Sequence, residues 1–172
     1  MKKFEFTRLV MPLRDRMFRY AQSLLLSSAE AEDVVHDLLE RMWRDHERME
    51  TPQRIDAFVM TALRNRCYDR LRRRRADERR CEQVKLTAER ATESDVSRWE
   101  ARELVRRAMA ALPGRQREVL HLKEIEGFAT REIADLIGCD EAQVRVILSR
   151  GRTALRGILQ KMMNDERKTK TH

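Results

Sequence analysis

Glycine and proline are scarce in this chain of 172 residues, which contains 5 and 3 of them respectively. β-Rich folds with many tight turns use more of both residues, so the scarcity favours an all-α protein. The three cysteines, Cys67, Cys81 and Cys139, are odd in number and form no CxxC pair. This argues against a disulfide framework or a zinc site and favours reduced thiols.

Long apolar runs are also missing from the sequence. No stretch approaches the roughly 18 apolar residues that a membrane-spanning helix needs. After Lys2 and Lys3 the chain meets Glu5 and Arg8 before any apolar run forms, so no signal peptide is predicted. We therefore expect no membrane insertion and a cytoplasmic location.

The sequence lacks the common catalytic motifs, with no HExxH, no P-loop and no GxSxG. The four histidines are scattered along the chain. A nuclease would need grouped carboxylates for a metal ion; Asp33, Asp37 and Glu40 share a helix face, but no second carboxylate-bearing segment accompanies them. We expect that the protein is not an enzyme, that it has no metal site and that it requires no cofactor.

The charge is basic overall and unevenly distributed. The formal net charge is +8 and the sequence pI is near 9.9, which indicates an anionic partner such as nucleic acid or an anionic membrane surface. Residues 20–40 nevertheless contain five acidic residues and no Lys or Arg, whereas residues 64–75 contain seven arginines and one aspartate. Both departures from the average require an explanation.

The N-terminal part predicts three helices. Apolar residues recur at helical spacing between about residues 4 and 26. A second helix follows Ser27, which forms a capping-box pattern with Glu30, and a third is expected to start at Thr51 and Pro52. Together they predict a three-helix bundle over residues 1–76.

The C-terminal part predicts a second helical domain. Residues 77–98 are polar and mixed in charge, which is typical of a linker. A four-helix domain is expected over residues 99–162, followed by a polar tail over residues 163–172 that frays. Its most specific feature is a helix-turn-helix between Gly127 and Leu155, with Gly138 in the turn and Asp140 with Gln143 as a capping box.

The two helices of this motif have distinct faces. The residues expected at their contact are Ile133, Ala134, Ile137, Val144 and Leu148. The residues expected to point away are Arg145, Ser149, Arg152 and Arg156. Arginines at such positions can bind guanine or a backbone phosphate in the major groove, although a helical hairpin with a solvated basic face has the same pattern.

The two charged segments also allow two interpretations each. The arginine run continues an amphipathic helix beside Tyr68, so it can form a rigid surface for a nucleic-acid backbone or remain solvated. The acidic segment is either plain surface or a contact for a basic partner.

Taken together, the pattern resembles the extracytoplasmic-function group of bacterial sigma factors, the specificity subunits of RNA polymerase. The resemblance covers about residues 5–160. The residues that carry it in the first half are Ala31–Leu38, Trp43, Ala62–Asn65, Asp69, Arg72 and Arg73. Those in the second half are Leu112–Val119, Gly127, Glu132–Ala134, Gly138, Val144 and Arg150.

The resemblance implies a role for each segment. The acidic face, formed by Asp33, His36, Asp37, Glu40 and Arg41, would dock on the clamp helices of the polymerase's largest subunit. The promoter's minus-ten element would be bound by the loop of residues 48–56 and by Asn65, Arg72, Arg73, Arg74 and Arg75. The minus-thirty-five element would be read by Gln143, Arg145, Val146, Ser149 and Arg150.

The expected partners are therefore core RNA polymerase, including its flap, and promoter DNA. An anti-sigma factor is a further candidate, because many members of the group are held inactive by one. Four residues at the sites depart from the group's pattern. The group usually has glutamine where this chain has His36, glutamate at Asp37, threonine at Gln143 and alanine at Gly151. At residue 129, alanine replaces the usual Ser or Thr cap, and Thr130 is expected to cap the helix instead.

Two other classes share parts of the pattern. A LuxR-like regulator also has a Glu-Val-Leu segment before its helix-turn-helix, but it would lack the acidic helix and the arginine run at residues 30–75. An RNA-binding or structural helical protein would use the arginine run alone, and the second domain argues against it.

Overall fold

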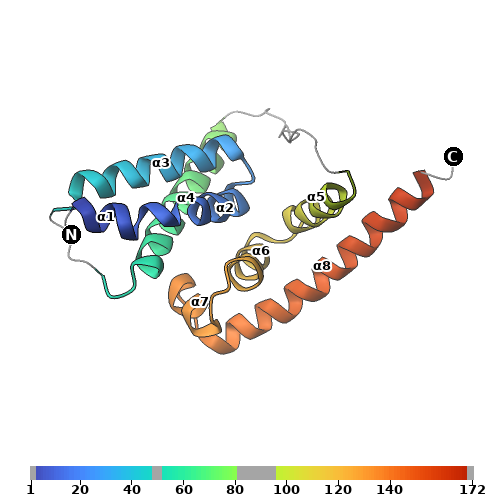
Figure 1. Cartoon of the computed structure of the whole chain (residues 1–172). Coiled ribbons are helices and arrows are strands. Elements are labelled where there is room, and N and C mark those ends of the chain that lie inside the picture. The colour runs from blue at the N-terminus through green and yellow to red at the C-terminus, as the bar shows by residue number, and fades with distance from the viewer. Residues whose placement is uncertain (1–2, 48–51, 81–95, 170–172) are drawn as a thin grey trace. The chain divides into compact units, whose positions relative to one another are not determined.

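The computed structural model of the chain describes residues 3–47, 52–80 and 96–169, and every regular element in these ranges is helical (Figure 1). The chain divides into two compact units, residues 1–89 and 90–172. The predicted all-α fold is confirmed, and the division falls inside the predicted linker, of which residues 81–95 lie outside the described ranges.

The first unit is built on three mutually packed helices, α2 (Arg14–Leu25), α3 (Ser28–Asp45) and α4 (Ile55–Arg80). A short helix α1 (Lys3–Leu9) and a 3-10 turn η1 (Met11–Leu13) precede them. The fully buried core includes Val10, Met17, Tyr20, Ala31, Val59, Met60, Leu63 and Cys67. These residues follow helical spacing, so burial of one apolar stripe per helix holds the bundle together.

Two helix boundaries differ from the sequence prediction. The expected first helix is interrupted at Pro12, which has no amide hydrogen to donate; there the Leu13 amide donates to the Val10 carbonyl in a tight turn (3.0 Å). The third helix begins at Ile55 rather than at Thr51 and Pro52. Its first carbonyl acceptor is that of Arg54, which accepts from the Phe58 amide (3.1 Å).

The start of α3 shows half of the predicted capping box. The Ser27 hydroxyl accepts from the Glu30 amide at 3.3 Å. The Glu30 carboxylate accepts instead from the guanidinium groups of Arg70 and Arg74 on α4 (3.1 and 3.2 Å). Glu30 therefore links the N-terminus of α3 to the arginine run.

The second unit consists of α5 (Val96–Ala110), α6 (Gly114–Leu120), α7 (Thr130–Ile137) and α8 (Glu141–Thr169), as the predicted four-helix domain requires. The helices α5, α6 and α7 each pack on α8. A π-helical segment η2 (His121–Ile125) extends α6 and ends at Glu126, before Gly127 takes the left-handed conformation (φ 73°).

The last helix is longer than predicted. Residues 163–169 were expected to be a fraying tail, but α8 continues to Thr169. The chain has no glycine or proline after Gly157, and residues with good helix propensity such as Gln160, Lys161 and Met162 follow. The extension therefore has a local cause.

Candidate nucleic-acid and protein interfaces

Helix α3 presents a polar face opposite its buried stripe. The exposed residues of this face are Asp33, His36, Asp37, Glu40 and Arg41. The buried residues on the other side are Ala31, Val34, Val35, Leu38 and Met42. The spacing of the exposed set, i, i+3, i+4, i+7 and i+8, places all five on one stripe of the helix. We name them the α3 acidic face.

The arginine run does not form a single surface. Successive residues of an α-helix are rotated by about 100°, so four consecutive arginines point in four directions. Arg72, Arg73 and Arg75 are exposed, whereas Arg74 is half-buried. Arg74, one of the residues expected to bind the minus-ten element, is therefore less exposed than its neighbours.

Arg74 is held inside the first unit. Its guanidinium donates to the carboxylate of Glu30 (3.2 Å) and to the carbonyl of Leu25 (3.5 Å), so it joins α4 to the ends of α2 and α3. Arg70 adds a second ion pair to the same carboxylate at 3.1 Å. These contacts indicate a structural role for Arg74.

Two faces of α4 are at least partly exposed. Asn65, Asp69 and Arg72 share one face at spacing i, i+4 and i+7, and the Arg72 guanidinium donates to the Asp69 carboxylate. On a neighbouring face, the Arg64 guanidinium stacks over the Tyr68 ring, 4.5 Å from its centroid. The expected minus-ten loop lies partly outside the described residues, because residues 48–51 are among those excluded.

The helix-turn-helix has the predicted geometry. Gly138 takes the left-handed conformation (φ 70°, ψ 50°), which a glycine adopts without steric cost. The Asp140 carboxylate accepts from the Gln143 amide at 2.7 Å and caps α8. The predicted contact residues Ile133, Ala134, Ile137, Val144 and Leu148 are all buried.

The start of α7 corrects the predicted cap. Thr130 is the first helical residue and Ala129 is the N-cap, so no side chain caps from that position. The Glu132 carboxylate instead accepts from the Ala129 amide at 2.7 Å. Glu132 thus supplies the half of a capping box in which the N3 carboxylate accepts from the N-cap amide, and Ala129 has no hydroxyl to supply the other half.

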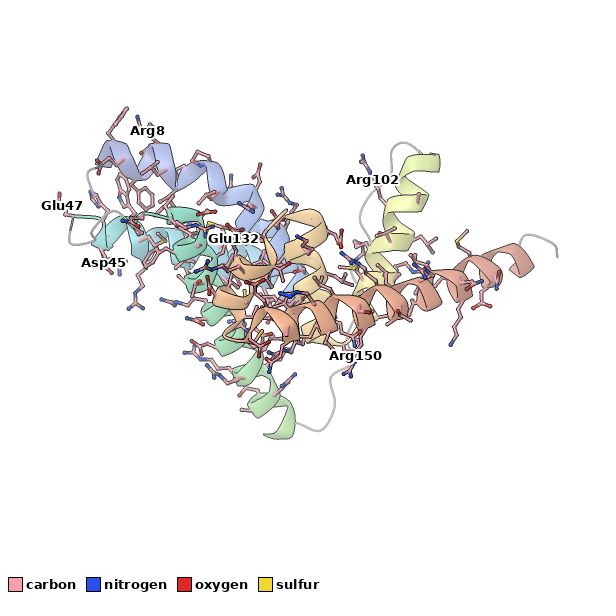
Figure 2. All side chains as sticks on the ribbon, turned by 90° about the horizontal axis from the view of Figure 1, so that it is seen from below. Arg8, Asp45, Glu47, Arg102, Glu132 and Arg150 are labelled. Atoms are coloured by element: carbon pink, nitrogen blue, oxygen red, sulfur yellow. The ribbon has the colours of Figure 1, made fainter. Side chains whose placement is uncertain are left out.

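The five predicted minus-thirty-five residues occupy the outward side of the first turns of α8. Gln143, Arg145, Val146, Ser149 and Arg150 are all exposed, opposite buried Val144, Leu148 and Gly151. Helical rotation places Val146 near the middle, with Arg145 and Ser149 on one flank and Gln143 and Arg150 on the other. Figure 2 labels Arg150 on this helix.

The two flanks differ in their ion pairs. Arg145 pairs with Glu141 at 3.1 Å, and Arg152, on the same flank, pairs with Glu124 of η2 at 2.6 Å. Across the described ranges, Arg150 on the opposite flank has no carboxylate partner. One flank is therefore partly neutralised within the protein itself.

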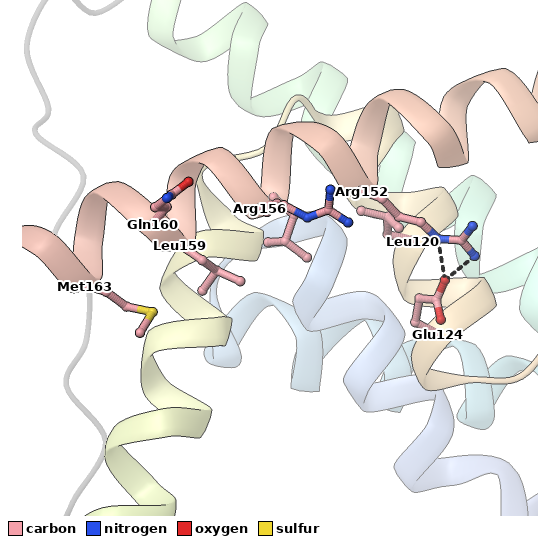
Figure 3. A pocket seen from close by; sticks show the side chains of 8 residues that line it. Leu120, Glu124, Arg152, Arg156, Leu159, Gln160 and Met163 are labelled. Carbon is pink, nitrogen blue, oxygen red and sulfur yellow. Dashed lines mark hydrogen bonds and ion pairs between the residues drawn. The ribbon is translucent and has the colours of Figure 1, made fainter.

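An open groove runs along the second half of α8 (Figure 3). Leu120, Leu155, Leu159 and Met163 supply its apolar lining. Glu124, Arg152, Arg156 and Gln160 supply its polar lining. The Glu124–Arg152 pair lies at one end of the groove (Figure 3).

Buried polar side chains on α6 and η2 were not predicted from the sequence. Arg117 donates to the carbonyls of Ala110 and Leu112 (both 3.0 Å), and His121 lies 3.2 Å from the Glu126 carboxylate. The His121 and Glu126 side chains are 6% and 2% exposed, so His121 is not a surface histidine. Charged residues are normally assigned to the surface, and the π-turn that buries them has no simple sequence signature.

Comparison with known proteins decides the family. Residues 9–76 match the family description Sigma-70 region 2, and residues 102–155 match Sigma-70, region 4. The ECF RNA polymerase sigma factor SigL of Mycobacterium tuberculosis is 32% identical over 150 residues, which cover 85% of this chain and 84% of that protein. The chain belongs to the extracytoplasmic-function sigma factors.

Other relatives agree with this assignment. The RNA polymerase sigma-E factor of Streptomyces coelicolor is 27% identical over 153 residues, or 88% of this chain and 84% of that one. The fold is similar to that of RpoE in its co-crystal with the anti-sigma factor NepR from Bartonella quintana, with a TM-score of 0.76, 24% identity and coverage of 91% and 97%.

A second solved fold, CnrH in complex with the cytosolic domain of CnrY, has a TM-score of 0.65, 22% identity and coverage of 93% and 90%.

Sigma factors are non-enzymatic initiation factors that bind core RNA polymerase and direct it to promoters, and this is the function of the chain. The LuxR-like alternative receives no support from these comparisons.

Two further features are absent from the described residues. No group of three or more His, Cys, Asp or Glu residues there is placed to hold a metal ion. Among the same residues, no helix has the length and apolar character of a membrane span.

Proposed function

We propose that the chain recruits core RNA polymerase through the α3 acidic face and positions it with two DNA-binding helices, α4 and α8. The observation that carries this proposal is the division of α3 into one buried apolar stripe and one exposed stripe of charged and polar residues. Intramolecular packing accounts for the buried stripe only. A partner with basic helices would account for the exposed one.

The two units have different DNA targets in this proposal. Residues 1–76 bind the minus-ten element through the loop before α4 and through Asn65, Arg72, Arg73 and Arg75. Residues 99–162 bind the minus-thirty-five element through the outward side of α8. The predicted connection, residues 77–98, includes the end of α4, which runs to Arg80, and the start of α5 at Val96. Exposure of these side chains and the outward spacing of those on α8 support both assignments.

Three further points belong to the proposal. The polymerase flap is a partner of the second unit, and the apolar end of the groove along α8, at Leu159 and Met163, supports this (Figure 3). An anti-sigma factor is a candidate regulator, since the RpoE structure was solved with one. The protein works in the bacterial cytoplasm, where polymerase and promoters are found, without a cofactor or a catalytic step of its own.

The proposal is tested by binding and by transcription. The purified full chain is mixed with bacterial core RNA polymerase, and the complex is assayed for stoichiometry and then for transcription from a pool of genomic promoters. Stoichiometric binding with new, discrete start sites is expected, and the start sites supply both promoter elements. Tight binding to duplex DNA without any binding to core polymerase would overturn the proposal.

A further inference from the structure

The structure assigns to Glu124 the role of withholding Arg152 from DNA phosphates, so that Arg152 is a phosphate-binding residue blocked by an intramolecular carboxylate. The inference rests on the proposed function only in that α8 is taken to lie against DNA. Neither residue belongs to the set proposed to read bases.

The first observation is the contact itself. Two nitrogens of the Arg152 guanidinium, Nε and Nη2, donate to the same carboxylate oxygen of Glu124, at 3.0 and 2.6 Å (Figure 3). Both side chains are about half exposed, 55% and 50%. The pair is therefore accessible to a competing anion such as a phosphate.

The second observation is where Arg152 lies on α8. It is seven residues after Arg145 and three after Ser149, so the three residues share one flank of the helix. Arg152 lies on this flank beyond the turns that are proposed to read bases. Arg156 continues the same flank one turn later and is exposed. An arginine beyond the base-contacting turns of a recognition helix is placed to meet the DNA backbone.

The third observation explains how Glu124 reaches α8. The segment His121–Ile125 is π-helical, with the Glu126 amide donating to the His121 carbonyl at 3.1 Å. The buried pair of His121 and Glu126 holds this wider turn from inside, and Glu124 projects from its exposed side. The position of the carboxylate is therefore built into the fold rather than set by a free surface side chain.

A fourth observation fixes the distance between the two helices. Residue 151 is a glycine where α8 crosses α6, and a Cβ there would lie 3.0 Å from Leu120 Cδ1. This close approach brings the residue that follows, Arg152, next to the segment that follows Leu120. Glycine at residue 151 thus favours the ion pair.

The consequence for DNA binding is quantitative. A neutralised arginine releases no counterions when DNA binds, whereas a freed arginine adds one phosphate contact and steepens the dependence of log K on log salt by about 0.9. Phosphate contacts are independent of sequence, so Glu124 sets the strength and salt sensitivity of DNA binding and not the base preference.

The test uses holoenzyme assembled from core polymerase and the full chain. Its affinity for a duplex with the minus-thirty-five element, and for a scrambled duplex, is measured between about 50 and 200 mM salt. With Glu124→Gln we expect tighter binding to both duplexes, and an additional loss of about 3.5-fold in affinity across this salt range, as one extra phosphate contact requires.

Two further variants separate the inference from a general charge effect. Arg152→Gln combined with Glu124→Gln should cancel the gain and return the salt slope to the wild-type value, and this double variant leaves no unpaired carboxylate beside the DNA. Asp135→Asn removes an exposed carboxylate of α7 that has no ion pair within the described part of the chain, and serves as the control for net charge. It should leave the slope at the wild-type value.

Two outcomes would overturn the inference. One is a Glu124→Gln slope equal to that of Asp135→Asn. The other is a slope below the wild-type value in the double variant, because Arg152 would then already bind phosphate in the wild-type protein. Failure of the proposed function is read separately, from wild-type holoenzyme that selects no discrete promoters.

Discussion

Gly151 on α8 faces Leu120 at the end of α6, and the two helices approach so closely that a methyl group at residue 151 would lie 3.0 Å from Leu120 Cδ1. Leu120 is 1% exposed and has little room to move. Gly157 lies six residues further along the same helix, with no atom within 4 Å of an added Cβ. Close packing against Leu120 therefore favours glycine at residue 151, whereas no neighbouring atom favours glycine at residue 157.

We predict opposite effects of alanine at these two positions. Gly157→Ala should raise the free energy of unfolding by up to about 1 kcal/mol, through helix propensity alone. Gly151→Ala gains the same propensity but displaces Leu120, so a net loss of about 1 kcal/mol is expected. Urea unfolding followed by circular dichroism measures both. A stabilised Gly151→Ala variant would show that Leu120 yields without cost.

Leu26 ends α2 in the left-handed conformation (φ 56°, ψ 24°) and its side chain is about half exposed. This conformation costs a residue with a Cβ roughly 1–2 kcal/mol. Leu26→Gly should therefore stabilise the first unit by roughly 0.5 kcal/mol once the added entropy of the unfolded chain is subtracted. Leu26→Ala keeps the Cβ and is the matched control, with no gain expected in thermal unfolding.

Arg72 and Arg74 should respond differently to alanine. Arg74→Ala removes the contacts to Glu30 and to the Leu25 carbonyl, and should lower the free energy of unfolding by about 1–2 kcal/mol. Arg72→Ala, at an exposed position, should change it by less than about 0.5 kcal/mol but weaken DNA binding in a salt-dependent way. Equal stability of the two variants would contradict the structural role of Arg74.

Charge reversal on the α3 acidic face tests polymerase docking. Asp37→Arg should weaken binding to core polymerase by at least roughly tenfold, or about 1.4 kcal/mol, because it places a positive charge in the middle of this face. Asp15→Arg makes the same change at an exposed site on α2 and should bind normally. Surface plasmon resonance with immobilised core enzyme compares them, and unchanged affinity of Asp37→Arg would reject the docking face.

Arg145→Ala tests base reading by α8. The variant should lose about 1–3 kcal/mol of binding to duplexes with the minus-thirty-five element and lose discrimination at one base position. Holoenzyme binding to a set of single-base variants of that element gives the measurement. A uniform loss on all sequences would instead indicate a phosphate contact.

The sequence by itself determined the fold class, the helix-turn-helix and the division into two charged surfaces. These follow from apolar residues at helical spacing and from local caps, such as Gly138 and Asp140, whose effects act within a few residues. The resemblance to sigma factors rested on the same local patterns, and the comparisons confirmed it.

Only the tertiary structure decided which charged side chains are available to a partner. Four consecutive arginines look equivalent in the sequence, yet Arg74 binds Glu30 of another helix. Arg152 was predicted only to point away from the helix contact, and it pairs with Glu124, 28 residues earlier, because a π-turn and a glycine at residue 151 bring the two together. Such pairings depend on where distant segments meet in space, and no periodicity within one helix encodes that.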